Sequence, residues 1–331
     1  MNLLIKTFYM IYMKTSILVG GQAVIEGVMM RVPGAYATAL RLKNGEIISK
    51  RFNFVSIIER YHMKKYFIIR GFVHLYESMK IGYRTLDWSA DIYESENNDN
   101  KNKKKSIVNI FFEKLISIFS ILFSIGLFLG LPLYFSSLLI PGNTNSPFYF
   151  NIISGIIRIT IFLIYLILIS QLNDIKRLFQ YHGAEHKTVY NFESGRELNI
   201  ENAQKFSTLH PRCGTSFIFI IMIVTIFSYT ILDSIALLFI DNLSFSIRLI
   251  MHLLCLPLVA GIGYEVLKFL SSKQHIFIFK SLSKPGLLLQ NITTKEPDDL
   301  QLEVAIYALK AAFDNKIDKF TGKQYTADSI G

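Results

Sequence analysis

Cysteine is scarce in this 331-residue chain, which contains only Cys213 and Cys255. Two cysteines exclude a disulfide-rich scaffold. Cys255 lies inside an apolar run, where a cysteine packs like a small hydrophobic residue. Charged residues are also few, at 18% of the chain against 51% hydrophobic residues. The formal net charge is +10, but no recognisable nucleic-acid-binding module is present. We therefore predict no nucleic-acid partner.

The N-terminus lacks the pattern of a cleaved signal peptide. Lys6 and Lys14 interrupt its apolar patches, and no small-residue cleavage site follows them. Sequence typical of ordered structure begins only at Thr15, so Met1 and Met13 are both plausible initiating residues.

The apolar residues gather in four long runs, and this distribution predicts the fold class. The runs cover Leu115–Ile140, Phe150–Ser170, Thr215–Ile240 and Ile247–Leu270. Each is long enough to cross a hydrocarbon core, which needs about 20 helical residues. Buried helices of a soluble protein are the alternative, but four such runs in one chain make it the weaker interpretation.

The loops between the runs predict the orientation. The short loops 141–149 and 241–246 contain no Lys or Arg, whereas the segments before the first run, between the second and third, and after the fourth are basic. Positive charge is retained in the cytoplasm. We therefore expect a multi-pass protein of the inner, cytoplasmic membrane with both termini and the loop 171–213 in the cytoplasm. Membrane lipids are then partners.

The remaining segments predict a small α+β cytoplasmic part built from both ends of the chain. Asn44-Gly45, between two strand-like segments, is a strong hairpin signal, and residues 67–93 resemble a helix. A helix is expected from Asp299 to about Asn315, capped by Thr294 or an Asp and packed on the sheet or on the helix ends, after a turn at Pro285-Gly286. The predicted organisation is residues 1–95 as the N-terminal cytoplasmic α+β segment, 96–112 as a polar linker, 113–270 as the four-helix membrane domain, and 271–331 as the C-terminal cytoplasmic segment.

The segment His182-Gly-Ala-Glu185-His186 is the best candidate for chemistry. Two histidines four residues apart share one face of a helix and can bind one metal ion. The order H-x-x-E-H occurs in the inverted zincins, where the glutamate takes a proton from metal-bound water. Polar residues on a helix that leaves the bilayer are the alternative interpretation.

Further ligands are available near the same face of the membrane. His210 and Cys213 precede the third run, and Glu265 lies near the cytoplasmic end of the fourth. Any of these residues can complete the shell, and a structural role for Cys213 is equally open. Glu26 and Arg31 lie in a glycine-containing stretch and either border the same pocket or form an ion pair in a turn. We interpret Arg158 and Asp233 as interfacial anchors.

Six motifs carry a resemblance that covers nearly the whole chain. They are GGQAVIEGVMMR at 20–31, RGFVHLYES at 70–78, YHGAEHKTVYNFESG at 181–195, HPRCGTSF at 210–217, AGIGYE at 260–265 and TTKEPDDLQLEVAIYAL at 293–309. With these motifs the chain resembles the YqhQ-like family of bacterial proteins, a domain of unknown function. The resemblance implies a membrane protein that is expected to depend on a metal, and it names no substrate.

Two functional hypotheses follow. The first is a membrane-embedded, metal-dependent hydrolase in which His182 and His186 bind a divalent metal, with zinc preferred, and Glu185 is the general base. Its substrate is lipid, lipid-linked or part of a membrane-proximal protein. The second is a non-catalytic assembly or scaffold protein with a structural metal or polar core. A transporter is a weaker hypothesis, because four spans are few, although a homodimer packed through Gly126 and Gly130 would strengthen it.

Overall fold

The computed structural model describes residues 19–61, 66–97, 107–140, 146–210, 213–272 and 277–314, together with Ile317 and Phe320. The two candidate starts at Met1 and Met13, most of the predicted linker and the final residues lie outside this range.

A four-stranded antiparallel meander forms the N-terminal part of the molecule. Its strands are β1 (Gly20–Val24), β2 (Gly27–Val32), β3 (Ala35–Arg41) and β4 (Ile47–Asn53), in the order β1-β2-β3-β4. The predicted antiparallel sheet is confirmed. So is the hairpin at Asn44-Gly45, where Gly45 adopts a φ of 87°, a conformation that glycine reaches without steric cost.

Our main error in predicting the sheet concerns the stretch from Gly20 to Arg31. We expected a turn or pocket-bordering segment, but it forms the hairpin β1–β2, with Val24 paired to Gly27. Ile25 and Glu26 make the turn, and Glu26 has a φ of 55°. The strand signal was missed because glycines interrupt the stretch. At Gly27 a side chain would overlap β3, so the glycine permits close strand pairing.

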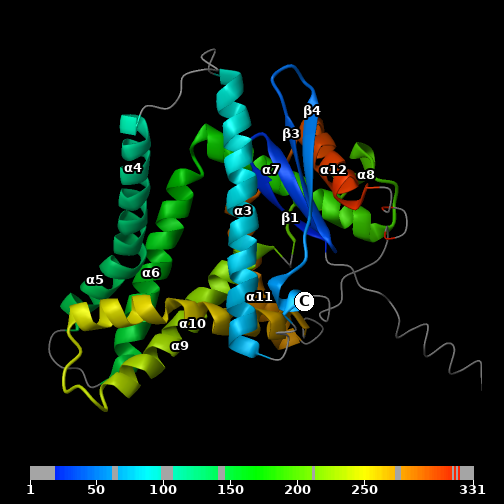
Figure 1. Ribbon diagram of the computed structural model, residues 1–331. Coiled ribbons are helices and arrows are strands. Elements are labelled where there is room, and N and C mark those ends of the chain that lie inside the picture. Colours follow the sequence, from blue (N-terminus) through cyan, green and yellow to red (C-terminus); the bar gives the residue numbers. More distant parts are fainter. Residues whose placement is uncertain are drawn as a thin grey trace, which may run out of the picture.

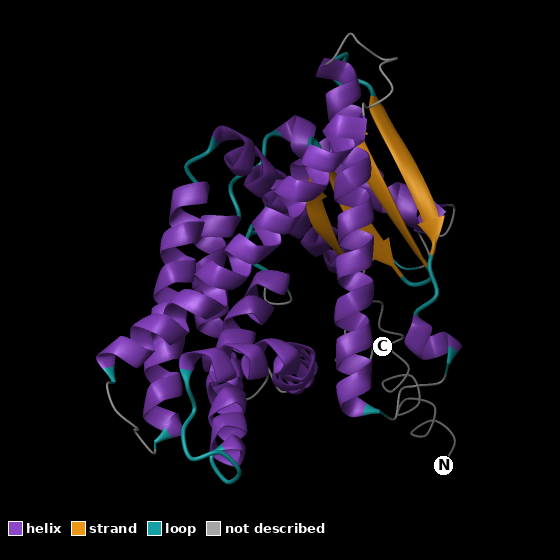
Figure 2. Cartoon of the chain, turned by 60° about the vertical axis from the view of Figure 1, so that its left-hand side comes forward, coloured by secondary structure: helices purple, strands orange, loops and turns teal. Residues whose placement is uncertain are grey.

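The two faces of this sheet are covered by different helices. Val28, Met30 and Val32 of β2 join a buried core with α7 (Asn173–Ser194) and α12 (Asp299–Phe313). The alternate residue Met29 packs with Ile81 of α3 (Phe67–Asn97) on the other face. Because successive strand residues point to opposite faces, β2 holds both layers together. Figures 1 and 2 show α3 between the sheet on one side and the apolar helices on the other.

The predicted C-terminal helix is confirmed as α12, but the turn predicted before it is wrong. The helix packs on β2 and β3, and Asp298 caps its first turn in a reciprocal arrangement with Gln301. Leu302, Ala305, Ile306 and Leu309, which share the predicted apolar face, are all buried. The predicted turn at Pro285-Gly286 is wrong, because both residues lie inside α11 (Phe277–Thr293). Packing of α11 against α9 outweighs the backbone hydrogen bond that the proline removes.

Four apolar helices long enough to span a membrane form the rest of the fold, covering residues 114–139, 147–169, 218–236 and 245–266. The first is built from α4 (Ile107–Ile125), the π-helix η2 (Gly126–Gly130) and α5 (Leu131–Leu139). The others are α6 (Pro147–Ile169), α9 (Gly214–Ala236) and α10 (Phe245–Ser272). The short helices α2 (Ile57–Arg60) and α8 (Ile200–Gln204) complete the described elements. These four helices indicate a multi-pass membrane protein.

A cluster of buried polar side chains links three of these helices. Asp233 of α9 is fully buried and accepts a hydrogen bond of 2.8 Å from the Asn151 amide of α6. Two residues of α10 also approach Asp233. The His252 Nε2 lies 2.8 Å from the other carboxylate oxygen, Oδ1, and the Arg248 Nε lies 3.4 Å from Oδ2, the oxygen that Asn151 contacts. Our interpretation of Asp233 as an interfacial anchor is therefore wrong, because opposite charge from α10 stabilises it inside the bundle.

Arg158 is also buried in the bundle rather than anchored at its surface. Its Nε donates to the Phe128 carbonyl of η2 at 3.0 Å, and another guanidinium nitrogen donates to the Thr225 hydroxyl of α9 at 3.1 Å. The Arg158 side chain thus connects α6 to both η2 and α9. Intramembrane charges of this kind are costly unless they are paired or hydrogen-bonded.

Replacing Asp233 with alanine should destabilise the helix bundle by about 3–5 kcal/mol, because it leaves His252 and Arg248 buried without a carboxylate. Thermal or chemical unfolding of the detergent-purified protein measures the effect. Ser234→Ala is the matched control, since the Ser234 side chain is exposed and its hydroxyl donates to the Thr230 carbonyl of its own helix. Equal unfolding midpoints for the two variants would contradict a stabilising role for the cluster.

Candidate metal centre

Helix α7 carries the central motif, and its small residues explain how the helix is seated. Ala184 is fully buried in the core with the sheet and α12. A side chain at Gly183 would overlap the Lys295 carbonyl, just beyond α11, while the Lys295 N–H donates to the Phe179 carbonyl of α7 at 2.9 Å. The two small residues therefore let α7 approach both neighbours closely, and this fixes the direction of the flanking histidines.

Both imidazoles are held through the same ring nitrogen. His182 Nδ1 lies 2.8 Å from the Thr293 carbonyl oxygen, and His186 Nδ1 is hydrogen-bonded to the Thr208 carbonyl oxygen. A carbonyl only accepts, so each Nδ1 carries a proton, and in the neutral form of each ring Nε2 is the nitrogen that can bind a metal. Metal-binding histidines are oriented in this way by a partner on the second nitrogen.

Cys213 completes the cluster from the start of α9. Its Sγ lies 3.2 Å from His182 Nε2, and it accepts hydrogen bonds from the Thr215 N–H at 3.5 Å and the Thr215 hydroxyl at 3.2 Å. One ligand atom from each of His182, His186 and Cys213 lies within 4.8 Å of the others. Two nitrogens and one sulfur at this spacing form a donor set that suits zinc.

Glu185 and His210 surround the cluster. A Glu185 carboxylate oxygen lies 3.4 Å from His186 Nε2. Since that nitrogen presents a lone pair in the neutral ring, a proton or a metal cation between the two groups would remove their repulsion. The His210 ring centre lies 5.4 Å from that of His186. Two hydrogen bonds between its backbone and the Gln290 amide, of 2.7 and 2.9 Å, hold this loop.

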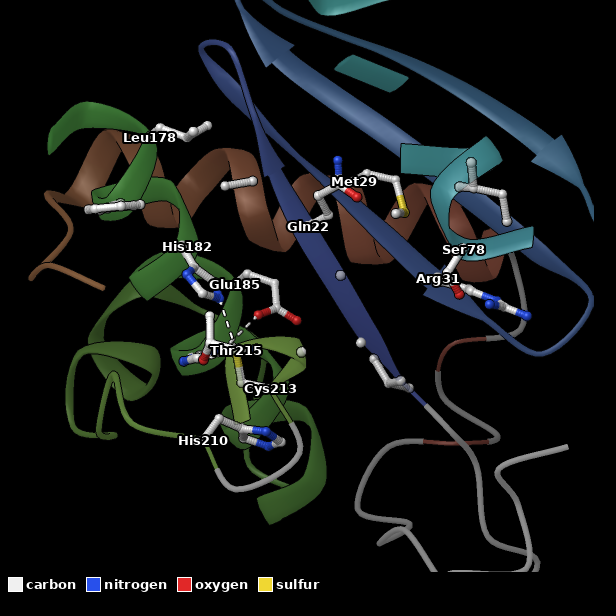
Figure 3. A pocket seen from close by; sticks show the side chains of 18 of the residues that line it. Gln22, Met29, Arg31, Ser78, Leu178, His182, Glu185, His210, Cys213 and Thr215 are labelled. Atoms are coloured by element: carbon white, nitrogen blue, oxygen red, sulfur yellow. Dashed lines mark hydrogen bonds and ion pairs between the residues drawn. The ribbon is translucent and has the colours of Figure 1, made fainter. Parts of the chain in front are cut away.

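A cavity of about 530 Å³ opens beside the cluster. It is lined by α3, α7, the β1–β2 hairpin and the first residues of α9 (Figure 3). His182, Glu185, His186, His210 and Cys213 all contribute to its wall. A molecule in the cavity would therefore reach the cluster and the carboxylate together.

The three supporting candidates, Glu26, Arg31 and Glu265, have different positions relative to the cavity. Arg31 lines the cavity, but Glu26 and Glu265 are not among its described lining residues. Glu26 pairs with Arg177 of α7 and accepts from the Tyr181 hydroxyl at 3.3 Å. Glu265 forms two contacts of 3.0 and 2.5 Å with Arg70 of α3, so these carboxylates join elements of the fold and contact other groups than the cluster.

Burial and neighbouring charges shift the pKa values of two residues near the site, Tyr181 and Arg31. Burial raises the pKa of Tyr181, and the adjacent Glu26 raises it further, so the phenol stays protonated. Burial lowers the pKa of Arg31, while the surrounding groups Glu77, Tyr264 and Glu59 raise it. Arginine nevertheless keeps its charge in proteins, so a cation faces the cavity.

Sequence reasoning missed the groups that orient the ligands. The Thr208 and Thr293 carbonyls are main-chain atoms, which no residue pattern identifies. Gln290 lies on α11, a helix that we did not predict because we expected a turn at Pro285-Gly286.

Comparison with known proteins places the chain in a family. Residues 67–315 match the family described as a protein of unknown function (DUF1385). The chain is 34% identical over 302 residues to "Uncharacterized protein YqhQ" of Bacillus subtilis (strain 168), covering 87% of this chain and 89% of the relative. The chain belongs to this YqhQ-like family. No solved structure matches it significantly.

Replacing Gly183 with valine should destabilise the site by about 1–3 kcal/mol, because the new side chain displaces the Lys295 segment and with it the Thr293 carbonyl. Gly126→Ala is the control, since a Cβ there meets no heavy atom within 4 Å. Unfolding midpoints compare the two. A Gly183→Val protein as stable as wild type would contradict this packing.

Proposed function

We propose that this chain is a metal-dependent enzyme of the cytoplasmic membrane, with its active site at the cytoplasmic face and a hydrolytic reaction as the best fit. The observation that carries the proposal is the convergence of two oriented imidazoles and a thiol beside a carboxylate. We further propose that zinc occupies the cluster.

The packing of the polar elements supports this topology. The sheet precedes the first apolar helix, α7 lies between the second and third, and α12 follows the fourth, yet all three share one core. They can meet only if an even number of crossings separates them, which two pairs of spans provide. Combined with the basic loops, this favours cytoplasmic termini. Exposed apolar side chains on the four helices, such as Phe119, Leu238 and Phe239, suit contact with lipid.

The donor set supports a catalytic rather than a purely structural ion. His182, His186 and Cys213 supply three ligands, and catalytic zinc sites typically have three protein ligands and an open position. Zinc bound there would activate a water molecule and polarise a substrate oxygen. Glu185, beside His186 and on the cavity wall, would accept a proton from such a water.

Metal analysis of the detergent-purified protein tests the proposal directly. We expect about one divalent ion per chain in the wild type, and its loss in His182→Ala and Cys213→Ala, because each variant removes one of three ligands. The control is Cys255→Ala, which removes the other cysteine, on α10, and should keep the metal. Equal metal content in wild type and His182→Ala would overturn the proposal.

Glu185→Gln separates the enzyme from a non-catalytic scaffold with a structural metal, which the compact cytoplasmic part also suits. The amide cannot accept a proton, so turnover should fall by about 10²- to 10⁴-fold while metal content is unchanged. Comparing lipid extracts of cells that express wild type or the variant would reveal a substrate that accumulates only with the variant. Glu201→Gln, an exposed residue paired with Lys205, controls for charge. A scaffold predicts identical extracts for all three proteins.

A further inference from the structure

Arg31 stands apart from the other charged groups of the cavity. It lies on β2, and it is on the side of the cavity away from His182 and Cys213, next to Ser78 of α3 (Figure 3). Its guanidinium carbon lies 4.6 Å from the centre of the Phe54 ring. Within the described part of the chain its side chain makes no hydrogen bond and no ion pair. Its five N–H donors are therefore available to a guest.

The carboxylate that acts most strongly on Arg31 has other partners. Glu77, which most strongly raises the Arg31 pKa, accepts from the Ser56 hydroxyl at 2.8 Å and from the Ile57 N–H at 2.5 Å. The attraction of Glu77 thus offsets only part of the cost of burying the Arg31 guanidinium. An anion that enters the cavity would offset it directly.

The rest of the cavity wall is largely apolar. It is formed by Val19, Met29, Ile81, Leu178, Phe179 and Ile218. Ile218 begins the third candidate span, so the cavity reaches the level where α9 enters the apolar part of the molecule. A hydrocarbon chain could therefore enter from the bilayer while its polar head meets the cluster and Arg31.

We propose that the cavity binds an anionic amphiphile, with Arg31 holding its phosphate or carboxylate group and the apolar wall holding its hydrocarbon part. This inference rests on the proposed function for its biological meaning, because the bound molecule would be the substrate. Arg31 is a binding residue in this scheme, and the chemistry belongs to the cluster on the other side of the cavity. The guanidinium fork suits a pair of anionic oxygens better than a lysine does.

Lipid-dependent thermal stability of the full chain in detergent tests the inference. Phosphatidylglycerol should raise the unfolding midpoint of the wild type, since a ligand that binds only the folded state stabilises it. Phosphatidylcholine, which has no net charge, should have little effect, and inorganic phosphate should act only at much higher concentration. Arg31→Gln should need roughly tenfold or more phosphatidylglycerol for the same shift, because it loses a charged hydrogen-bonding group. Arg31→Lys, which keeps the charge, should lie between the two.

Arg84→Gln is the matched control, because Arg84 is an exposed residue of α3 outside the cavity lining. It removes the same charge and should respond like the wild type. Arg31→Gln should keep the metal content of the wild type, because Arg31 is not one of the three candidate ligands, so a failed metal site and a failed anion site give different results. Equal responses of wild type and Arg31→Gln would overturn the inference. A response to phosphatidylcholine or to inorganic phosphate equal to that to phosphatidylglycerol would overturn it as well.

Discussion

Burial of one sheet face against α7 and α12 is the interaction on which the rest of the structure depends. Val28 and Met30 from β2, Tyr181 and Phe192 from α7, and Leu302 and Leu309 from α12 share a single core, although nearly the whole chain separates the first from the last. Burial of apolar surface contributes about 25 cal/mol per Å². This core therefore holds together segments that precede, separate and follow the two pairs of apolar helices. Its formation requires the chain to return to the sheet after each pair of apolar helices. It also fixes α7, and with it the two histidines.

The candidate metal centre is a consequence of that arrangement. Seating α7 through Gly183 and Ala184 turns His182 and His186 toward the first residues of α9, where Cys213 lies. The carbonyls that orient the imidazoles come from Thr208 and Thr293, on either side of the third and fourth apolar helices. The site is therefore assembled from the polar connections of the membrane-type helices, and any shift of α9 or α11 relative to α7 would change the ligand geometry.

The apolar helices have a second polar centre, formed by residues other than those that line the cavity. Asp233, Asn151 and His252 join α9, α6 and α10, and Arg158 joins α6 to η2 and α9. In an apolar surrounding such groups form hydrogen bonds and ion pairs with one another, because no water is available there to satisfy them. The bundle is thus specified by directional contacts in addition to close packing.

Local patterns were sufficient to predict the four apolar helices, the hairpin at Asn44-Gly45, the helical face of α12 and the shared face of His182 and His186, because period, length and turn chemistry are local properties. They also identified Cys213 and Arg31 as candidates. Only the tertiary structure decided that Arg31 lines the cavity while Glu26 and Glu265 form ion pairs with Arg177 and Arg70. It alone placed Asp233 and Arg158 inside the bundle, and it carried a helix through Pro285. These outcomes depend on which distant segments pack together, and the free energy of that packing outweighs the local preferences from which a sequence is interpreted.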